Sequence, residues 1–274
     1  MEQRNESGIL YKVWEILKPL VIYYVACNAA FLLIAYLCNA VMEYFGAGVQ
    51  EYMTGHVETM TELVNGLSML VSAMLLLPML RRELAVNKES ANSKAGKKAQ
   101  NIILVVILAS SSSICLNILL TLTGFVQTST TYQDVAKQQY GVVFGVGAIL
   151  FGLISPIAEE IVFRGLVFNR LRRYYKAVPA MVVSGLLFGV YHGNLVQGLY
   201  GTCMGILLAY TYERMHSFLV PCLFHAVANF MVYTLAQNVE LHTRLFTVPV
   251  CIILLAVSVV CILVVEKLSN VVEL

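Results

Sequence analysis

Charged side chains are scarce in this sequence, and their scarcity excludes most classes of soluble protein. Asp, Glu, Lys and Arg make up 12% of the 274 residues, whereas 59% of the residues are hydrophobic. The mean hydropathy of +0.76 is far above the average of soluble domains. Lys and Arg lie at the ends of apolar runs and form no stripe, so the net charge of +2 indicates no nucleic-acid partner. The composition predicts an integral membrane protein in contact with the lipid bilayer.

Cysteine patterns typical of disulfide frameworks or metal sites are also missing. All seven cysteines lie within apolar segments, and none has a CxxC or CxxxH spacing. We therefore expect small membrane-buried side chains, without a disulfide framework or a structural zinc site. The first apolar run begins at about Leu20 and has no small-residue cleavage site, which predicts a spanning helix and not a signal peptide.

Long apolar runs, in contrast, recur along the whole chain. A helix of about 20 apolar residues crosses the roughly 30 Å hydrocarbon core of a bilayer. These runs predict an all-α fold, a polytopic membrane bundle of about eight transmembrane helices. The predicted spans are residues 19–42, 66–80, 101–125, 141–164, 178–193, 195–212, 217–236 and 246–266.

Basic residues alternate between the two sides of these spans. Lys and Arg precede the first span, follow the second and separate the fourth from the fifth, but none lies within residues 43–66. The positive-inside rule then predicts a multi-pass cell-membrane protein with both termini in the cytoplasm. Its short loops and compact length are typical of a bacterial protein. Segment 88–98 is expected to be a mobile cytoplasmic loop, and the basic segment 170–176 an interfacial stretch.

Glycines at four-residue spacing predict faces where helix backbones approach closely. In a bilayer such small residues allow the tight packing that holds helices together. The pairs are Gly141 with Gly145, Gly185 with Gly189, and Gly201 with Gly205.

Three charged residues lie together in the fourth predicted span, in the stretch ISPIAEEIVFRG (154–165). A charge at the centre of a membrane helix costs about 2.5–3.5 kcal/mol on insertion scales, so each needs a compensating partner or a role. Glu160 and Arg164 are four residues apart, the spacing that favours an ion pair. Glu159 points about 100° away from Glu160 on a helix and cannot share that partner equally. We therefore expect Glu160 to be neutralised and Glu159 to be free to act as a base.

Further polar residues follow in two later spans. His192 ends the stretch FGVYH, and His225 and Asn229 share one helix face in HAVAN. Counting back from the basic helix ends at about 1.5 Å per residue places Glu159, His192 and His225 at similar depth. A structural ion pair explains only Glu160 and Arg164, so the other residues predict a shared buried site. The remaining histidines, His56, His216 and His242, are assigned no role.

Together the three stretches resemble a known family. EEIVFR, FGVYH and HAVAN match, in order, the motifs EExxxR, FxxxH and HxxxN of the CPBP (Abi) family of intramembrane proteases. That family includes CAAX-processing enzymes and bacterial relatives linked to bacteriocin self-immunity. The resemblance covers roughly residues 141–236, which it implies are the catalytic core. Residues 1–140 then hold transmembrane helices without a recognised motif, and residues 237–274 a C-terminal transmembrane helix of the same integral membrane domain.

The resemblance implies an endopeptidase in which Glu159 and His192 activate a water molecule. His225 and Asn229 would stabilise the oxyanion, while Glu160, Arg164 and Phe188 would support the site. This agrees with the needs of amide hydrolysis, a base and oxyanion donors fixed in a low-dielectric cavity. No Ser or Cys is paired with a base, which disfavours a covalent acyl-enzyme. The resemblance implies a glutamate-activated water that needs no cofactor. The alternative is a zinc metalloprotease with Glu159, His192 and His225 as ligands, although the HExxH signature is absent.

The leading hypothesis is an endopeptidase whose buried site opens to the cytoplasmic side and takes membrane-embedded or membrane-associated peptides, of the prenylated or leader type. A second hypothesis is a non-proteolytic membrane scaffold or immunity protein in which the polar cluster binds a peptide or partner. A third is a transporter or a haem carrier that uses His192 and His225, which a visible absorption band would reveal. The sequence does not identify the substrate.

Overall fold

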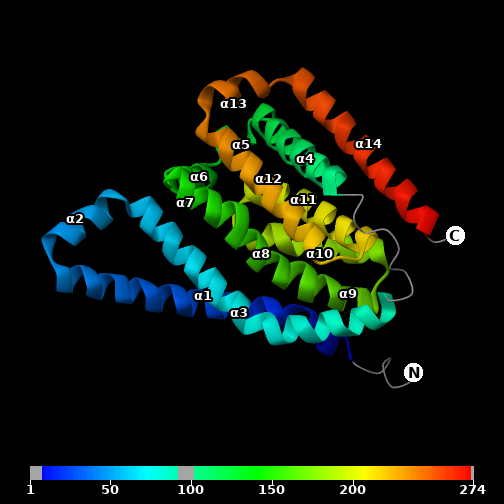
Figure 1. Cartoon of the computed structure of the whole chain (residues 1–274), viewed down its shortest axis with the longest axis horizontal. Helices are drawn as coiled ribbons and strands as arrows, with labels where there is room; N and C mark the ends of the chain where they lie inside the picture. The colour runs from blue at the N-terminus through cyan, green and yellow to red at the C-terminus, as the bar shows by residue number, and fades with distance from the viewer. Residues whose placement is uncertain (1–7, 92–101, 273–274) are drawn as a thin grey trace.

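The computed structural model describes residues 8–91 and 102–272, and these residues form helices joined by short turns, with no strand among them. Figure 1 shows the chain as a bundle of helices. The elements are α1 (Ile9–Phe45), α2 (Ala47–Gly55), α3 (Val57–Ala91), α4 (Ile102–Leu122), α5 (Phe125–Thr128), α6 (Thr130–Tyr140), α7 (Phe144–Ile149), the π-helical η3 (Leu150–Ile154), α8 (Ser155–Glu160), the π-helical η4 (Ile161–Phe168), α9 (Asn169–Tyr174), α10 (Ala177–Tyr191), α11 (Leu195–Met215), α12 (Leu219–Gln237), α13 (Val239–Leu245) and α14 (Val248–Val272).

Each predicted span corresponds to a helix, so the chain is a multi-pass helical membrane protein. Six helices within the described residues are long and apolar enough to cross a membrane by themselves: α1, α3, α4, the continuous helix from α7 to α9, α12 and α14. The other two predicted spans are α10, which is apolar but shorter, and α11, which carries more polar residues. Of the predicted loop 88–98, the first four residues continue α3 and the rest lie outside the described residues.

The continuous helix from α7 to α9, called the central helix below, lies in the middle of the bundle. It packs against α1, α3, α10 and α12, while α4 packs between α12 and α14, and α1 pairs with α3. The start of α1, the end of α14 and α9 lie at one end of the bundle, and α2, α6 and α13 lie toward the other (Figure 1). The core contains apolar side chains of the central helix, such as Val162, Phe163 and Leu166, packed on Leu76 and Phe224.

Glycines allow α10 and α11 to pack with their backbones in contact. A Cβ atom added to Gly185 would lie 2.6 Å from Ile206 Cγ1, and one added to Gly205 would lie 2.8 Å from Gly185 Cα. The predicted packing face is therefore confirmed for the glycines of α10 and α11. It is wrong for Gly145, which has nothing within 4 Å of such an atom. Its predicted partner, Gly141, follows the end of α6 and lies outside the central helix.

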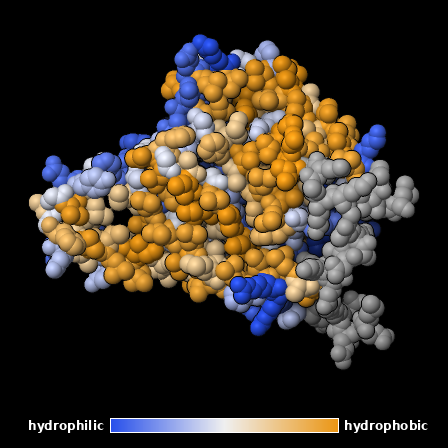
Figure 2. All heavy atoms as spheres, in the orientation of Figure 1, coloured by the Kyte–Doolittle hydropathy of each residue, from blue (hydrophilic) through white to orange (hydrophobic). Residues whose placement is uncertain are grey.

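Apolar side chains cover most of the visible surface (Figure 2). Leu32 on α1 is 69% exposed and Ile103 on α4 is 74% exposed, as expected for residues that face lipid. At the basic end, in contrast, the predicted interfacial stretch 170–176 is partly buried. Arg170 lies 3.1 Å from Glu83, and Arg173 also contacts Glu83. These arginines anchor α9 to α3, a structural role that their position at a helix end did not indicate.

Candidate active site

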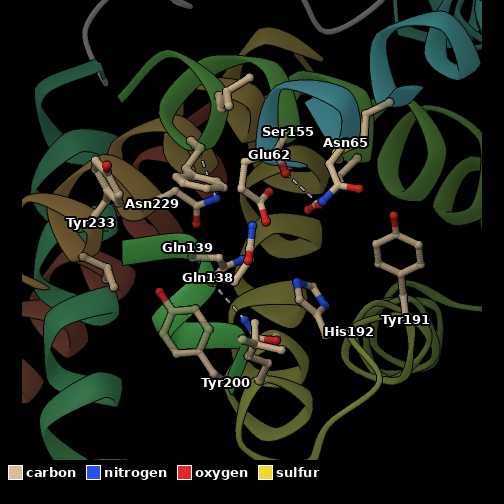
Figure 3. A pocket seen from close by; sticks show the side chains of 18 of the residues that line it. Glu62, Asn65, Gln138, Gln139, Ser155, Tyr191, His192, Tyr200, Asn229 and Tyr233 are labelled. Carbon is tan, nitrogen blue, oxygen red and sulfur yellow. Dashed lines mark hydrogen bonds between the residues drawn. The ribbon is translucent and has the colours of Figure 1, made fainter. Parts of the chain in front are cut away.

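A cavity of about 880 Å³ lies between α1, α3, α4, α6, α10, α11, α12 and the central helix. The four predicted catalytic residues all line it: Glu159, His192, His225 and Asn229. Phe188 also lines it, and Figure 3 shows His192 and Asn229 among the surrounding polar side chains. Glu159, His192 and His225, which the sequence predicts at similar depth, thus line one cavity.

The π-helical segment η3 sets up the backbone in front of Glu159. At its end the Ser155 N–H donates to the Leu150 carbonyl, five residues earlier. With the same five-residue spacing, the N–H of residue 156 would donate to the Phe151 carbonyl, but residue 156 is a proline and has no N–H. The Asn229 side chain supplies the missing donor, with its Nδ2 3.2 Å from the Phe151 oxygen. One of the amide protons expected to stabilise an oxyanion thus ties α12 to the central helix.

The predicted ion pair between Glu160 and Arg164 is confirmed. Arg164 Nη1 lies 2.9 Å from Glu160 Oε1, and both side chains are fully buried. Arg164 Nη2 also donates to the Gly205 carbonyl at 2.9 Å, and the guanidinium stacks 4.7 Å from the centre of the Phe188 ring. Because it contacts α10 and α11 as well, Arg164 fixes three helices around the cavity.

His225 makes a contact that the sequence did not indicate. Its Nδ1 lies 2.8 Å from Glu160 Oε1, the same oxygen that receives Arg164. A carboxylate oxygen accepts, so Nδ1 carries the proton of this hydrogen bond. Glu160 therefore orients the His225 ring as well as pairing with Arg164, and the other ring nitrogen, Nε2, is turned to Glu159 at 3.7 Å from its Oε2.

Glu159 is 5% exposed and has a further partner that sequence reasoning missed. Ser155, four residues earlier on α8, donates its hydroxyl to Glu159 Oε1 at 2.9 Å. The spacing of the two residues on one helix face was the available signal. The hydrogen bond holds one carboxylate oxygen, so that the other faces His225.

His192 follows the last residue of α10 and is half-buried. Its Nδ1 lies 2.8 Å from the Phe188 carbonyl. A carbonyl only accepts, so Nδ1 carries the proton and Nε2 keeps a lone pair. The Phe188 ring lies edge-on to both imidazoles, 4.9 Å from that of His192 and 5.5 Å from that of His225. Phe188 thus orients the two histidines from one position.

The alternative zinc site is not gathered in this structure. Among the residues that the structure describes, no three His, Cys, Asp or Glu side chains are placed to hold a metal ion. Glu159, His192 and His225 line the same cavity, and hydrogen bonds at Nδ1 of both histidines leave their Nε2 atoms to face it. These side chains would have to move closer together to share one metal ion.

The mouth of the cavity lies near α6 and between α1 and α4. Asp134 on α6 and Tyr24 on α1 both line the cavity and are exposed. On α6, burial raises the pKa of Tyr132 and of Tyr140, so both phenols stay neutral at the mouth. This mouth lies toward the end opposite α9 and its arginines (Figure 1). The expected opening to the cytoplasmic side stays a prediction, and α6 and the outer part of α1 shape the access.

Comparison with known proteins identifies the segment that carries these residues. Residues 142–231 match the family described as type II CAAX prenyl endopeptidase Rce1-like. Over 84 residues the chain is 33% identical to YdiL of Bacillus subtilis (strain 168), which is named as a proposed membrane peptidase. That match covers 31% of this chain and about a third (34%) of the relative's length. No solved structure is significantly similar to the chain. The segment from residue 142 to residue 231, which holds the EExxxR, FxxxH and HxxxN motifs, is thus similar in sequence to the Rce1-like family.

Proposed function

We propose that this protein is an intramembrane endopeptidase that cleaves peptide bonds of membrane-associated peptides with a water molecule activated by Glu159. The observation that carries the proposal is the placement of Glu159: one carboxylate oxygen accepts from Ser155, and the other faces His225 inside a cavity large enough for a peptide segment. The Rce1-like family and the peptidase name of the Bacillus relative support a hydrolase.

The charges around Glu159 support a specific division of roles. Glu159, Glu160, Arg164 and His225 form one buried cluster. Two carboxylates balance one arginine only if one further proton is bound, and an unbalanced buried charge is costly. That proton belongs on the pair of Glu159 and His225, whose facing atoms are 3.7 Å apart. With the proton on His225 Nε2, Glu159 is a free base and His225 is a cationic donor for a developing oxyanion.

The reaction then proceeds in two steps. Glu159 takes a proton from water as the water oxygen bonds to the substrate carbonyl carbon, and the oxyanion accepts from His225 Nε2. When the C–N bond breaks, Glu159 passes its proton to the leaving nitrogen. The lone pair on His192 Nε2 orients the attacking water, and the second amide proton of Asn229 is available to the oxyanion. Phe188, Glu160 and Arg164 hold the imidazoles and helices in place.

The test compares the wild type with Glu159→Gln, using detergent-purified protein and a diverse peptide library. We expect Glu159→Gln to abolish cleavage because it removes the base while keeping the volume. Its thermal unfolding should remain cooperative, which excludes misfolding as the cause. A wild-type sample with a strong zinc chelator tests the metal alternative directly. Cleavage retained in Glu159→Gln refutes the mechanism, and cleavage lost with the chelator replaces it with metal chemistry.

A further inference from the structure

The charge of the cavity wall is one-sided. Three carboxylates line it, those of Glu62, Asp134 and Glu159, and none of the lining residues is a lysine or arginine. Their exposure places them along the path from the mouth to the site: Asp134 is exposed, Glu62 is half-buried and Glu159 is buried. Carboxylates that line a cavity with low-dielectric walls focus a negative potential into it. The outer part of the cavity, at Asp134 and Glu62, therefore attracts cations and repels anions, whereas His225 lies beside Glu159 at the inner end.

The hydrogen-bond partners of Glu62 are amide side chains, which carry no compensating charge. The amide side chains of Asn65 and Gln138 donate to it, which orients the carboxylate without neutralising it. Glu160, in contrast, has Arg164 and His225 as partners and lies behind the wall. Figure 3 shows Glu62 with Asn65 and Gln138 around the cavity.

The uncharged part of the wall suits an extended peptide backbone. Amide side chains contribute both donors and acceptors, and tyrosines contribute flat apolar faces with a polar end. Among them the Gln197 Nε2 donates to Gln139 Oε1 at 3.5 Å, a long contact that both groups can exchange for one with a peptide. Besides Asn229, the amides are Asn28, Asn65, Asn117, Gln138, Gln139 and Gln197.

We propose, building on the proposed function, that the substrate segment bound in this cavity is cationic. It carries Lys or Arg side chains or a free N-terminal ammonium group, and it enters at the mouth between α1, α4 and α6. An acidic segment would have to pass the carboxylates of Asp134 and Glu62, where no lysine or arginine lines the wall. The cavity therefore selects against acidic segments.

Binding to Glu159→Gln protein tests this inference without requiring catalysis. The probes are three fluorescent 12-residue peptides of the same Leu, Ser and Gly composition, with two central positions occupied by Lys, Gln or Glu. Fluorescence anisotropy in an uncharged detergent measures the Kd of each. We expect the Lys peptide to bind at least about tenfold more tightly than the Glu peptide, equivalent to about 1.4 kcal/mol. The Gln peptide should lie between them.

Two further variants show whether the cavity causes the preference. Adding Glu62→Gln and Asp134→Asn should remove most of the difference between the Lys and Glu peptides. The matched control adds Glu43→Gln and Glu51→Gln, which change the net charge equally at exposed positions outside the cavity wall. Equal binding of the three peptides overturns the inference, as does a preference that the cavity variants leave unchanged or the absence of any binding. Cleavage by the wild type without a charge preference overturns the inference alone, whereas loss of all cleavage with a retained binding preference overturns only the proposed function.

Discussion

The buried pair of Glu160 and Arg164 allows a quantitative test of the site's architecture. Both side chains are fully buried, and the joining atoms are 2.9 Å apart. Removing one partner of such a pair costs about 3–5 kcal/mol, mainly because the other charge stays buried without compensation. We expect Arg164→Met and Glu160→Gln each to lower the free energy of unfolding by about this amount. Arg164→Met also loses the hydrogen bond to Gly205 and the stacking on Phe188.

The double variant distinguishes a coupled pair from two independent losses. With both charges removed no uncompensated charge remains, so its cost should be smaller than the sum of the single costs by about 2–3 kcal/mol. The assay is reversible unfolding in mixed detergent and SDS micelles, followed by circular dichroism. The control is the half-exposed pair of Arg172 and Glu213, which lie 2.8 Å apart. An exposed pair contributes about 0–1 kcal/mol, so Arg172→Met and Glu213→Gln should be nearly silent. If the cost of the double variant equals the sum of the two single costs to within about 0.5 kcal/mol, the coupling between Glu160 and Arg164 is refuted.

Two further predictions test the packing of the bundle. Gly205→Ala places a Cβ 2.8 Å from a backbone atom of α10 and should lower the free energy of unfolding by about 1–3 kcal/mol. The Cβ of Gly145→Ala meets nothing within 4 Å, so this substitution should be neutral or stabilising by up to about 1 kcal/mol. Thermal unfolding in detergent measures both effects. Equal effects of the two substitutions would contradict the close contact of α10 and α11. Cys115 on α4 and Cys251 on α14 have sulfur atoms 3.7 Å apart, so a mild oxidant should link them at about 2.05 Å, which mass mapping detects as a loss of two free thiols. Two free thiols after full oxidation would show that α4 and α14 are not adjacent.

The local parts of the site could be predicted from the sequence because helix geometry fixes them. The four-residue spacing of Glu160 and Arg164 was enough to place their ion pair, and the depth count was enough to place His192 and His225 on one cavity with Glu159. These results need only the rise and the period of a helix. They do not depend on how neighbouring helices rotate about their axes.

The contacts that were missed depend on such rotations and on distant partners. His225 lies 2.8 Å from Glu160 and 3.7 Å from Glu159, a choice that no spacing within α12 encodes. Arg170 finds Glu83 across 87 positions of sequence, so its ion pair looked like part of an interfacial run. The position of the mouth depends on where α6 packs, and a positive-inside count places helix ends without saying which end is covered. The cytoplasmic location of the termini remains a prediction.

Because the π-helical segments η3 and η4 lie on either side of α8, the geometry of the site depends on the number of residues in the central helix as well as on the motif residues. A π turn closes its hydrogen bond one residue later than an α turn, so it holds a residue that a regular helix would not. Losing one residue from η3 would turn everything before it by about 100° relative to Glu159. The Phe151 carbonyl would then leave Asn229, although every motif letter would remain. If this core is grafted into another helical bundle, the number of residues between Phe144 and Glu159 must therefore be preserved. A sequence search for related sites should penalise insertions and deletions in this segment as strongly as substitutions of the motif residues.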